Sequence, residues 1–107
     1  MMNIEEILGL DEFNKVIKEN TLVLADFYAS WCTPCKMQAP ILAEFYEEMD
    51  KKVKIIKIDV DQNPELASKF GVQSIPTLIL FKGGQIKEKT VGLSAKAMLS
   101  EMLIKHI

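Results

Sequence analysis

The chain has few of the residues that mark disulfide-rich and metal-binding proteins. It contains two cysteines, one histidine and one tryptophan in 107 residues. Two cysteines cannot form the multi-bridge framework of small secreted proteins, and a tetrahedral zinc site needs four ligands. We therefore expect no bound metal, except in the case that two chains combine their cysteine pairs.

Charge of one sign and long apolar runs are also missing. Lys and Arg number 13 against 15 Asp and Glu, with no basic cluster, so nucleic acid and anionic membranes are not expected as partners. The longest apolar stretches, such as 22–25 and 78–81, are far too short to span a bilayer. The acidic N-terminal segment does not resemble a signal peptide, so we expect a cytoplasmic protein. In that reducing compartment a Cys-x-x-Cys pair is expected to be reactive rather than structural.

What is present predicts one α/β domain spanning residues 1–107. A hydrophobic fraction of 49% is enough for one core. The apolar periodicity predicts helices at about 11–20, 32–49, 64–70 and 95–103, and strands at 22–29, 53–60, 77–81 and 86–91. Alternation of strands and helices requires crossovers that place helices on both faces of a partly parallel sheet, and the final hairpin makes that sheet mixed.

The ends of these elements carry specific signals. Asp11, Asn63 and Ser94 are expected to cap helices with their side chains, and Gly71 to end the third helix in a left-handed conformation. Gly83-Gly84 predicts the hairpin turn. In the second helix a buried stripe is expected, with a kink at an internal proline; the residues concerned are Met37, Ile41, Phe45, Met49 and Pro40.

Cys32 and Cys35 lie where the strand ending near residue 29 passes into a helix. Residues three apart at a helix start share a face, so a small tightening of the first turn closes a disulfide and both redox forms are reachable. The unpaired N–H groups and the positive end of the helix dipole stabilise a thiolate on Cys32. We therefore expect Cys32 to attack a substrate disulfide and Cys35 to resolve the mixed disulfide.

The segment 26–36, which reads DFYASWCTPCK, resembles the active-site segment of the thioredoxin family. The similarity continues through residues 59–64, 75–77, 82–84 and 91–92, and so covers essentially the whole chain. The resemblance implies the thioredoxin fold, reduction of disulfide-containing protein substrates, and no bound cofactor other than the redox-active cysteine pair. It also implies re-reduction by a thioredoxin reductase that uses FAD and NADPH, and we expect a monomer.

Asp26 interrupts an apolar strand, where burial would raise the pKa of its carboxyl. It resembles the buried aspartate of the family and is expected to accept the proton of Cys35, although a side chain turned to solvent is the alternative. The resemblance also implies that Lys57 faces Asp26. A solvated lysine at a strand end is the other reading of Lys57.

The resemblance implies that the Ile75–Pro76 bond is cis and that both residues lie beside the disulfide. It also implies that the backbone before Pro76 pairs with an extended substrate. Trp31 and Gly92 would complete an apolar docking patch, although Trp31 could equally be a core residue and Gly92 a simple bend.

Two positions depart from the family pattern. Thr33-Pro34 stands between the cysteines where Gly-Pro is usual, and Tyr28 stands where tryptophan is usual. One hydrogen bond to a charged group is worth about 1.5–3 kcal/mol, less than the roughly 4 kcal/mol that separates thioredoxin from disulfide isomerase. We therefore expect Thr33 and Pro34 to tune the redox potential without converting a reductant into an oxidant. A more oxidising isomerase, a donor dedicated to one target and a binding subunit with dispensable thiols stay open.

Overall fold

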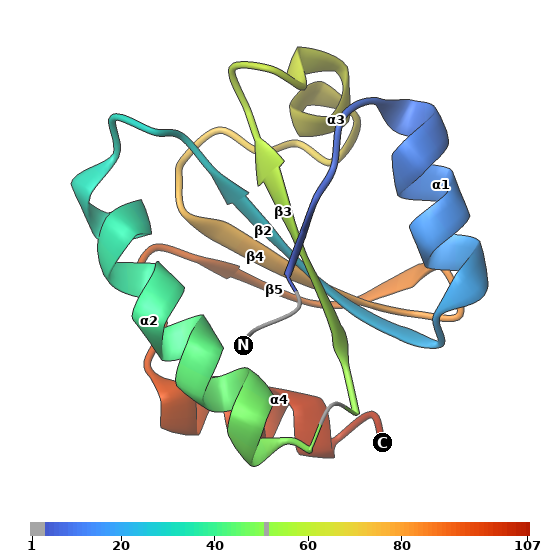
Figure 1. Ribbon diagram of the computed structural model, residues 1–107, viewed down its shortest axis with the longest axis vertical. Helices are drawn as coiled ribbons and strands as arrows, with labels where there is room; N and C mark the ends of the chain where they lie inside the picture. Colours follow the sequence, from blue (N-terminus) through green and yellow to red (C-terminus); the bar gives the residue numbers. More distant parts are fainter. Residues whose placement is uncertain (1–3, 51) are drawn as a thin grey trace.

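The computed structural model describes residues 4–50 and 52–107. A five-stranded sheet forms the centre and four helices cover it (Figure 1). In chain order the elements are β1 (Glu5–Glu6), α1 (Leu10–Glu19), β2 (Leu22–Tyr28), α2 (Thr33–Glu48), β3 (Lys54–Asp59), α3 (Pro64–Lys69), β4 (Thr77–Lys82), β5 (Gln85–Val91) and α4 (Lys96–Ile104).

The sheet has the strand order β1-β3-β2-β4-β5. β1, β3 and β2 run parallel, whereas β4 and β5 are antiparallel to their neighbours. This arrangement confirms the predicted mixed sheet with helices on both faces. β1 was not predicted, because two residues carry no periodic signal; it is held by its pairing with β3 and by Ile7, which is buried directly after it.

Each face of the sheet has its own core. α1 and α3 cover one face, where Phe13, Val16 and Leu66 pack on alternate residues of the strands. α2 and α4 cover the other, where Leu42 and Leu99 pack on β2, β3 and β4. The alternation of side chains along β2 divides its apolar residues between the two cores, which is why the strand is apolar at both parities.

The buried stripe expected on α2 was partly wrong. Met37 is 54% exposed, and the fully buried positions of the helix are Cys35, Gln38, Leu42, Phe45 and Tyr46. These positions follow helical spacing from Cys35, so the disulfide end of the helix sets which side faces the sheet. Pro40 lies inside the helix and is exposed; the kink expected there stays a prediction.

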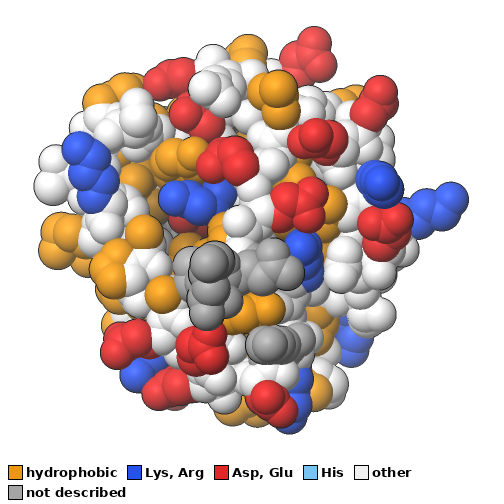
Figure 2. Space-filling model, in the orientation of Figure 1, with side chains coloured by type: hydrophobic (Ala, Val, Ile, Leu, Met, Phe, Trp, Pro, Cys, Tyr) orange, Lys and Arg blue, Asp and Glu red, His pale blue; other side chains and the backbone are white. Residues whose placement is uncertain are grey.

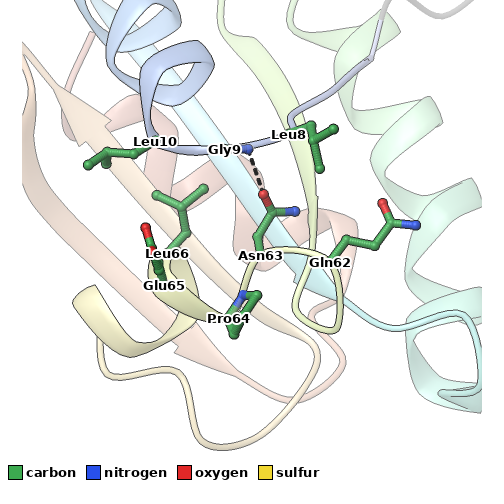
Figure 3. A pocket seen from close by; sticks show the side chains of 8 residues that line it. All are labelled: Leu8, Gly9, Leu10, Gln62, Asn63, Pro64, Glu65 and Leu66. Carbon is green, nitrogen blue, oxygen red and sulfur yellow. Dashed lines mark hydrogen bonds between the residues drawn. The ribbon is translucent and has the colours of Figure 1, made fainter.

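Two of the three predicted helix caps, Asp11 and Ser94, are wrong, and the third, Asn63, is confirmed as the N-cap residue but makes no side-chain capping bond. α1 begins one residue earlier than predicted, after Gly9, and α4 begins after the exposed residue Ala95. The side-chain amide of Asn63 instead joins α3 to the segment before α1: its oxygen accepts a hydrogen bond from Gly9 N at 2.8 Å (Figure 3). Its nitrogen donates to the Ile7 carbonyl. A surface pocket of about 270 Å³ lies around this contact.

The glycine signals are confirmed. Gly71 has φ +64°, and the bonds Val72 N to Ala67 O and Gly71 N to Ser68 O close the end of α3 in a Schellman motif. Gly83 and Gly84 have φ of +58° and +80° and connect β4 to β5, the charged strand at the sheet edge.

The outer surface is mixed in charge. On the face that Figure 2 shows, acidic side chains and lysines are interspersed with apolar ones. None of the helices in the described residues has the length and apolar character that crossing a bilayer requires. Within residues 4–50 and 52–107, no three His, Cys, Asp or Glu side chains gather as a potential metal site.

Candidate active site

Cys32 and Cys35 form a disulfide at the start of α2, beyond the carboxyl end of β2. Their Cα atoms are 5.2 Å apart, within the range that an unstretched disulfide bridges. The short connection from Tyr28 to Thr33 brings the pair to the edge where the parallel strands end, the usual place for sites in such sheets.

The helix terminus is directed at Cys32. Cys32 is the N-cap residue, and its Sγ accepts a hydrogen bond from the Cys35 N–H at 3.3 Å. Pro34, in the first turn, has no N–H of its own, so the Cys35 amide is the donor that reaches the sulfur. This amide and the positive end of the helix dipole together favour negative charge on Cys32. Thr33 and Pro34 are both exposed on the outer side of the turn.

The two sulfurs have different surroundings. Cys32 is 5% exposed, and its Sγ lies 3.8 Å from the carbonyl oxygen of Ile75. The Ile75–Pro76 bond is cis, as the resemblance implied. Cys35 is 4% exposed and instead lines a surface pocket of about 250 Å³ on the α2 side of the sheet, together with Tyr28 and Lys57.

Asp26 is the buried carboxyl of the site. It is 1% exposed, which excludes the alternative that its side chain turns to solvent, and neither carboxyl oxygen has a hydrogen-bond partner among the residues that the structure describes. Burial raises its pKa from 3.8 to about 7, while Lys57 opposes that rise and Glu6 adds to it. A group that titrates near neutrality can take up and release a proton at physiological pH.

Lys57 is the cross-strand neighbour of Asp26 in the β2–β3 register, so both side chains leave the sheet on the α2 face. The Lys57 ammonium lies 4.2 Å from the centroid of the Tyr28 ring. Because the carboxyl of Asp26 forms no hydrogen bond with Lys57 or any other residue in 4–50 and 52–107, Lys57 acts on it through space rather than by direct contact.

The remaining predicted residues lie around the disulfide. Trp31 is 67% exposed, which excludes a core position, and its indole N–H donates to Asp61 at 2.8 Å. Gly92 has φ +92°, and its N–H donates to the Pro76 carbonyl at 2.8 Å. Leu93 adds exposed apolar surface beside Gly92.

Sequence reasoning missed two polar contacts of this site. Asp61 was given no role from the sequence, and its carboxylate accepts the hydrogen bond of the Trp31 indole. Gln38 is fully buried and exchanges hydrogen bonds with the backbone of Ser94. One signal for Gln38 was available: it lies three residues after Cys35, on the same side of the helix.

Known proteins share this arrangement. A family model described as Thioredoxin matches residues 6–105. The chain belongs to the thioredoxin family. The thioredoxin of Bacillus subtilis is 55% identical over 86 residues, which cover 80% of this chain and 83% of the relative. That of Staphylococcus aureus is 47% identical over 106 residues, covering 99% of this chain and 100% of the relative.

Solved structures agree with the sequence comparison. A mutant thioredoxin from Halobacterium salinarum superposes with a TM-score of 0.90 at 39% identity, covering 96% of this chain and 89% of that one. Thioredoxins are protein-disulfide oxidoreductases that act through a redox-active disulfide and bind no cofactor. The family and the Cys32–Cys35 disulfide make this chain a thiol-disulfide oxidoreductase.

Proposed function

We propose that this chain is a cytoplasmic, monomeric, single-domain thioredoxin that reduces protein disulfides and is re-reduced by a thioredoxin reductase using FAD and NADPH. The observation that carries the proposal is the position of Cys32: its sulfur caps α2 and accepts the Cys35 N–H at 3.3 Å. This is the environment that stabilises an attacking thiolate.

The reaction follows from the two sulfurs. The Cys32 thiolate attacks one sulfur of the substrate disulfide, forms a mixed disulfide and expels the other substrate sulfur as a thiolate. Cys35 then loses its proton to Asp26 and attacks the Cys32 sulfur, which expels the second substrate thiolate and forms the Cys32–Cys35 disulfide. The substrate gains two electrons, and its two thiolates take up two protons from the medium.

Asp26 suits the second step because its pKa is about 7. Cys35 lines the same pocket as Lys57, and Lys57 is the cross-strand neighbour of Asp26. Asp26 itself is buried and does not line the pocket, so the transfer requires a water that reaches the carboxylate from the thiol. Lys57 provides the positive charge that limits the rise in the pKa of Asp26. Neither residue needs to contact the substrate.

Substrate docks on the apolar surface around Cys32. The Ile75 carbonyl, 3.8 Å from the Cys32 sulfur, offers an acceptor to an extended substrate backbone, in the manner of strand addition. Trp31 and Gly92 border this position, with Pro76 linked to Gly92 by a hydrogen bond. Thr33 and Pro34 tune the redox potential from the exposed side of the first turn.

The test traps the intermediate. Cys35→Ser should accumulate a mixed disulfide with insulin or another disulfide protein, because the second attack is lost, whereas the matched variant Cys32→Ser should trap none. Wild-type protein should couple NADPH oxidation by thioredoxin reductase to insulin reduction. Absence of a trapped species with Cys35→Ser would contradict the proposed electron carrier, and biological activity retained by the double serine variant would favour a binding subunit.

A further inference from the structure

A row of three charged side chains crosses the sheet from its edge to the active site. In the β1–β3 register Glu6 pairs with Lys57, and in the β2–β3 register Lys57 pairs with Asp26. Directly paired residues of neighbouring strands project to the same face. Glu6, Lys57 and Asp26 therefore all lie on the α2 face, in the order acid, base, acid.

Tyr28 joins the first two members of this row, Glu6 and Lys57. It is two residues after Asp26 on β2 and so projects to the same face. Its hydroxyl donates a hydrogen bond to Glu6 at 2.7 Å, and the Lys57 ammonium lies 4.2 Å from its ring centroid. One aromatic side chain thus holds both the Glu6 carboxylate and the Lys57 ammonium.

The hydroxyl of Tyr28 remains a donor throughout the working pH range. Burial raises the pKa of Tyr28, and the hydrogen bond to Glu6 raises it further. The contact with Glu6 therefore persists at any pH at which the Glu6 carboxylate is ionised. A phenylalanine at position 28 could contact the Lys57 ammonium through its ring but could not donate a hydrogen bond to the Glu6 carboxylate. Position 28 is also where this chain has tyrosine in place of the usual tryptophan.

We propose that Glu6 and Tyr28 are positioning residues for the dithiol reaction: Tyr28, which lines the pocket beside Cys35 together with Lys57, fixes the Glu6 carboxylate and the Lys57 ammonium on the face of the sheet where Asp26 lies. The fixed negative charge of Glu6 then favours the protonated form of Asp26. The expected effect of Glu6 and Tyr28 on the dithiol reaction rests on the proposed role of Asp26 as a base. The effect on the titration of Asp26 itself does not depend on that role.

The size of the effect follows from the sheet. Two strand spacings separate Glu6 from Asp26, roughly 10 Å. With an effective dielectric constant of about 40–80, suitable for an exposed charge, removal of the Glu6 charge shifts the titration of Asp26 by about 0.3–0.6 pH unit toward acid. Besides Glu6, the charge that acts on Asp26 is Lys57, which opposes the effect of Glu6. Lys36 lines the pocket beside Cys35, and Asp59 acts on Tyr28.

The experiment compares two neighbouring glutamates. Glu6→Gln keeps an oxygen that can accept the Tyr28 hydroxyl but removes the charge. Glu5→Gln removes the same charge from the same two-residue strand, yet Glu5 projects to the opposite face, where it pairs with Lys54 at 3.2 Å. The carboxyl titration of Asp26 is followed by NMR in the oxidised protein. We expect an acid shift of 0.3–0.6 pH unit with Glu6→Gln and a clearly smaller one with Glu5→Gln; equal shifts in the two variants, or none, would overturn the proposal.

A third variant tests the tyrosine. Tyr28→Phe retains the ring beside Lys57 and removes the hydroxyl that holds the exposed Glu6 carboxylate in place. The titration of Asp26 should therefore shift in the same direction as with Glu6→Gln and by less. An unchanged midpoint would refute the role of Tyr28. The pH profile of mixed-disulfide resolution should move with the NMR midpoint. If the NMR midpoint moves and the kinetic profile does not, the positioning inference stands and the proposed base role of Asp26 fails.

Discussion

The side-chain amide of Gln38 is paired with the backbone of Ser94 on both sides: its Nε2 donates to the Ser94 carbonyl at 3.0 Å, and its Oε1 accepts the Ser94 N–H at 2.8 Å. Gln38 is 0% exposed. The contact joins α2, which begins at the cysteines, to the segment that carries Gly92, whose N–H is bonded to Pro76. One amide therefore fixes the position of one substrate-docking segment relative to the disulfide.

We expect Gln38→Leu to destabilise the protein by about 2–4 kcal/mol, because it removes two hydrogen bonds and leaves both backbone groups of Ser94 buried without partners. Urea denaturation measures this loss. The freed segment should also raise KM for a protein substrate more than it lowers kcat, since docking is disturbed and the sulfurs are not.

The matched control is Gln62→Leu at an exposed glutamine, where the free energy of unfolding should change by no more than about 0.5 kcal/mol. If Gln38→Leu behaves as this control does, the amide contact contributes nothing to stability. If it destabilises without changing KM, the segment is held in place by Pro76 alone.

Asp26 should make the oxidised protein less stable as the pH rises. Its pKa is about 7 in the folded state against 3.8 unfolded, so between these values only the unfolded chain is ionised and stability falls. The difference corresponds to about 4 kcal/mol, fully developed above pH 7 and absent below pH 3.8. Asp26→Asn should lack this dependence, so its stability relative to wild type should rise by about that amount between pH 4 and pH 8.5.

Denaturation curves at several pH values provide the measurement. The control Asp11→Asn removes an exposed carboxyl in the first turn of α1 and should run nearly parallel to wild type. Parallel curves for Asp26→Asn and wild type would mean that the carboxyl ionises in the folded state as easily as in water.

Much of this site was predictable because local chemistry decides it. An acid in a strand that is apolar at both parities has to be buried, and Asp26 is. A Cys-x-x-Cys pair between a strand and a helix is expected to lie at the N-terminus of that helix, and Cys32 is the N-cap residue of α2. Gly71 ends its helix because a left-handed residue can close the Schellman bonds at no steric cost.

The rest depended on contacts between distant segments. Asn63 and Ser94 looked like helix caps because their side chains can bond the backbone next to them. In the fold the Asn63 amide instead accepts the Gly9 N–H, and the Ser94 hydroxyl pairs with the Thr90 hydroxyl. Met37 was expected to be buried because it is apolar, but it is exposed because the buried side of α2 is the side that carries Cys35. β1 is too short to show a pattern and forms only because β3 is beside it.

Gly71 also permits a stability test free of packing effects. Its φ is +64°, and a Cβ added there would meet nothing within 4 Å. Gly71→Ala should therefore cost only the left-handed backbone energy, about 1–2 kcal/mol, and Gly71→Asn less, because asparagine tolerates this conformation better. Equal losses for the two variants in urea denaturation would show that something other than the backbone angle is responsible.

The redox potential of the Cys32–Cys35 pair should lie nearer that of thioredoxin, about −270 mV, than that of protein disulfide isomerase, about −180 mV. The Thr33 hydroxyl lies on an exposed residue of the first turn. Even a full hydrogen bond from it to a charged sulfur, about 1.5–3 kcal/mol, would move the potential by only about 30–65 mV. Thr33→Val removes the hydroxyl and keeps the side-chain shape, so its potential should differ from wild type by less than this, and Thr33→Ser should match wild type. Equilibration with glutathione measures all three, and an isomerase-like potential for the wild-type protein would contradict its assignment as a reductant.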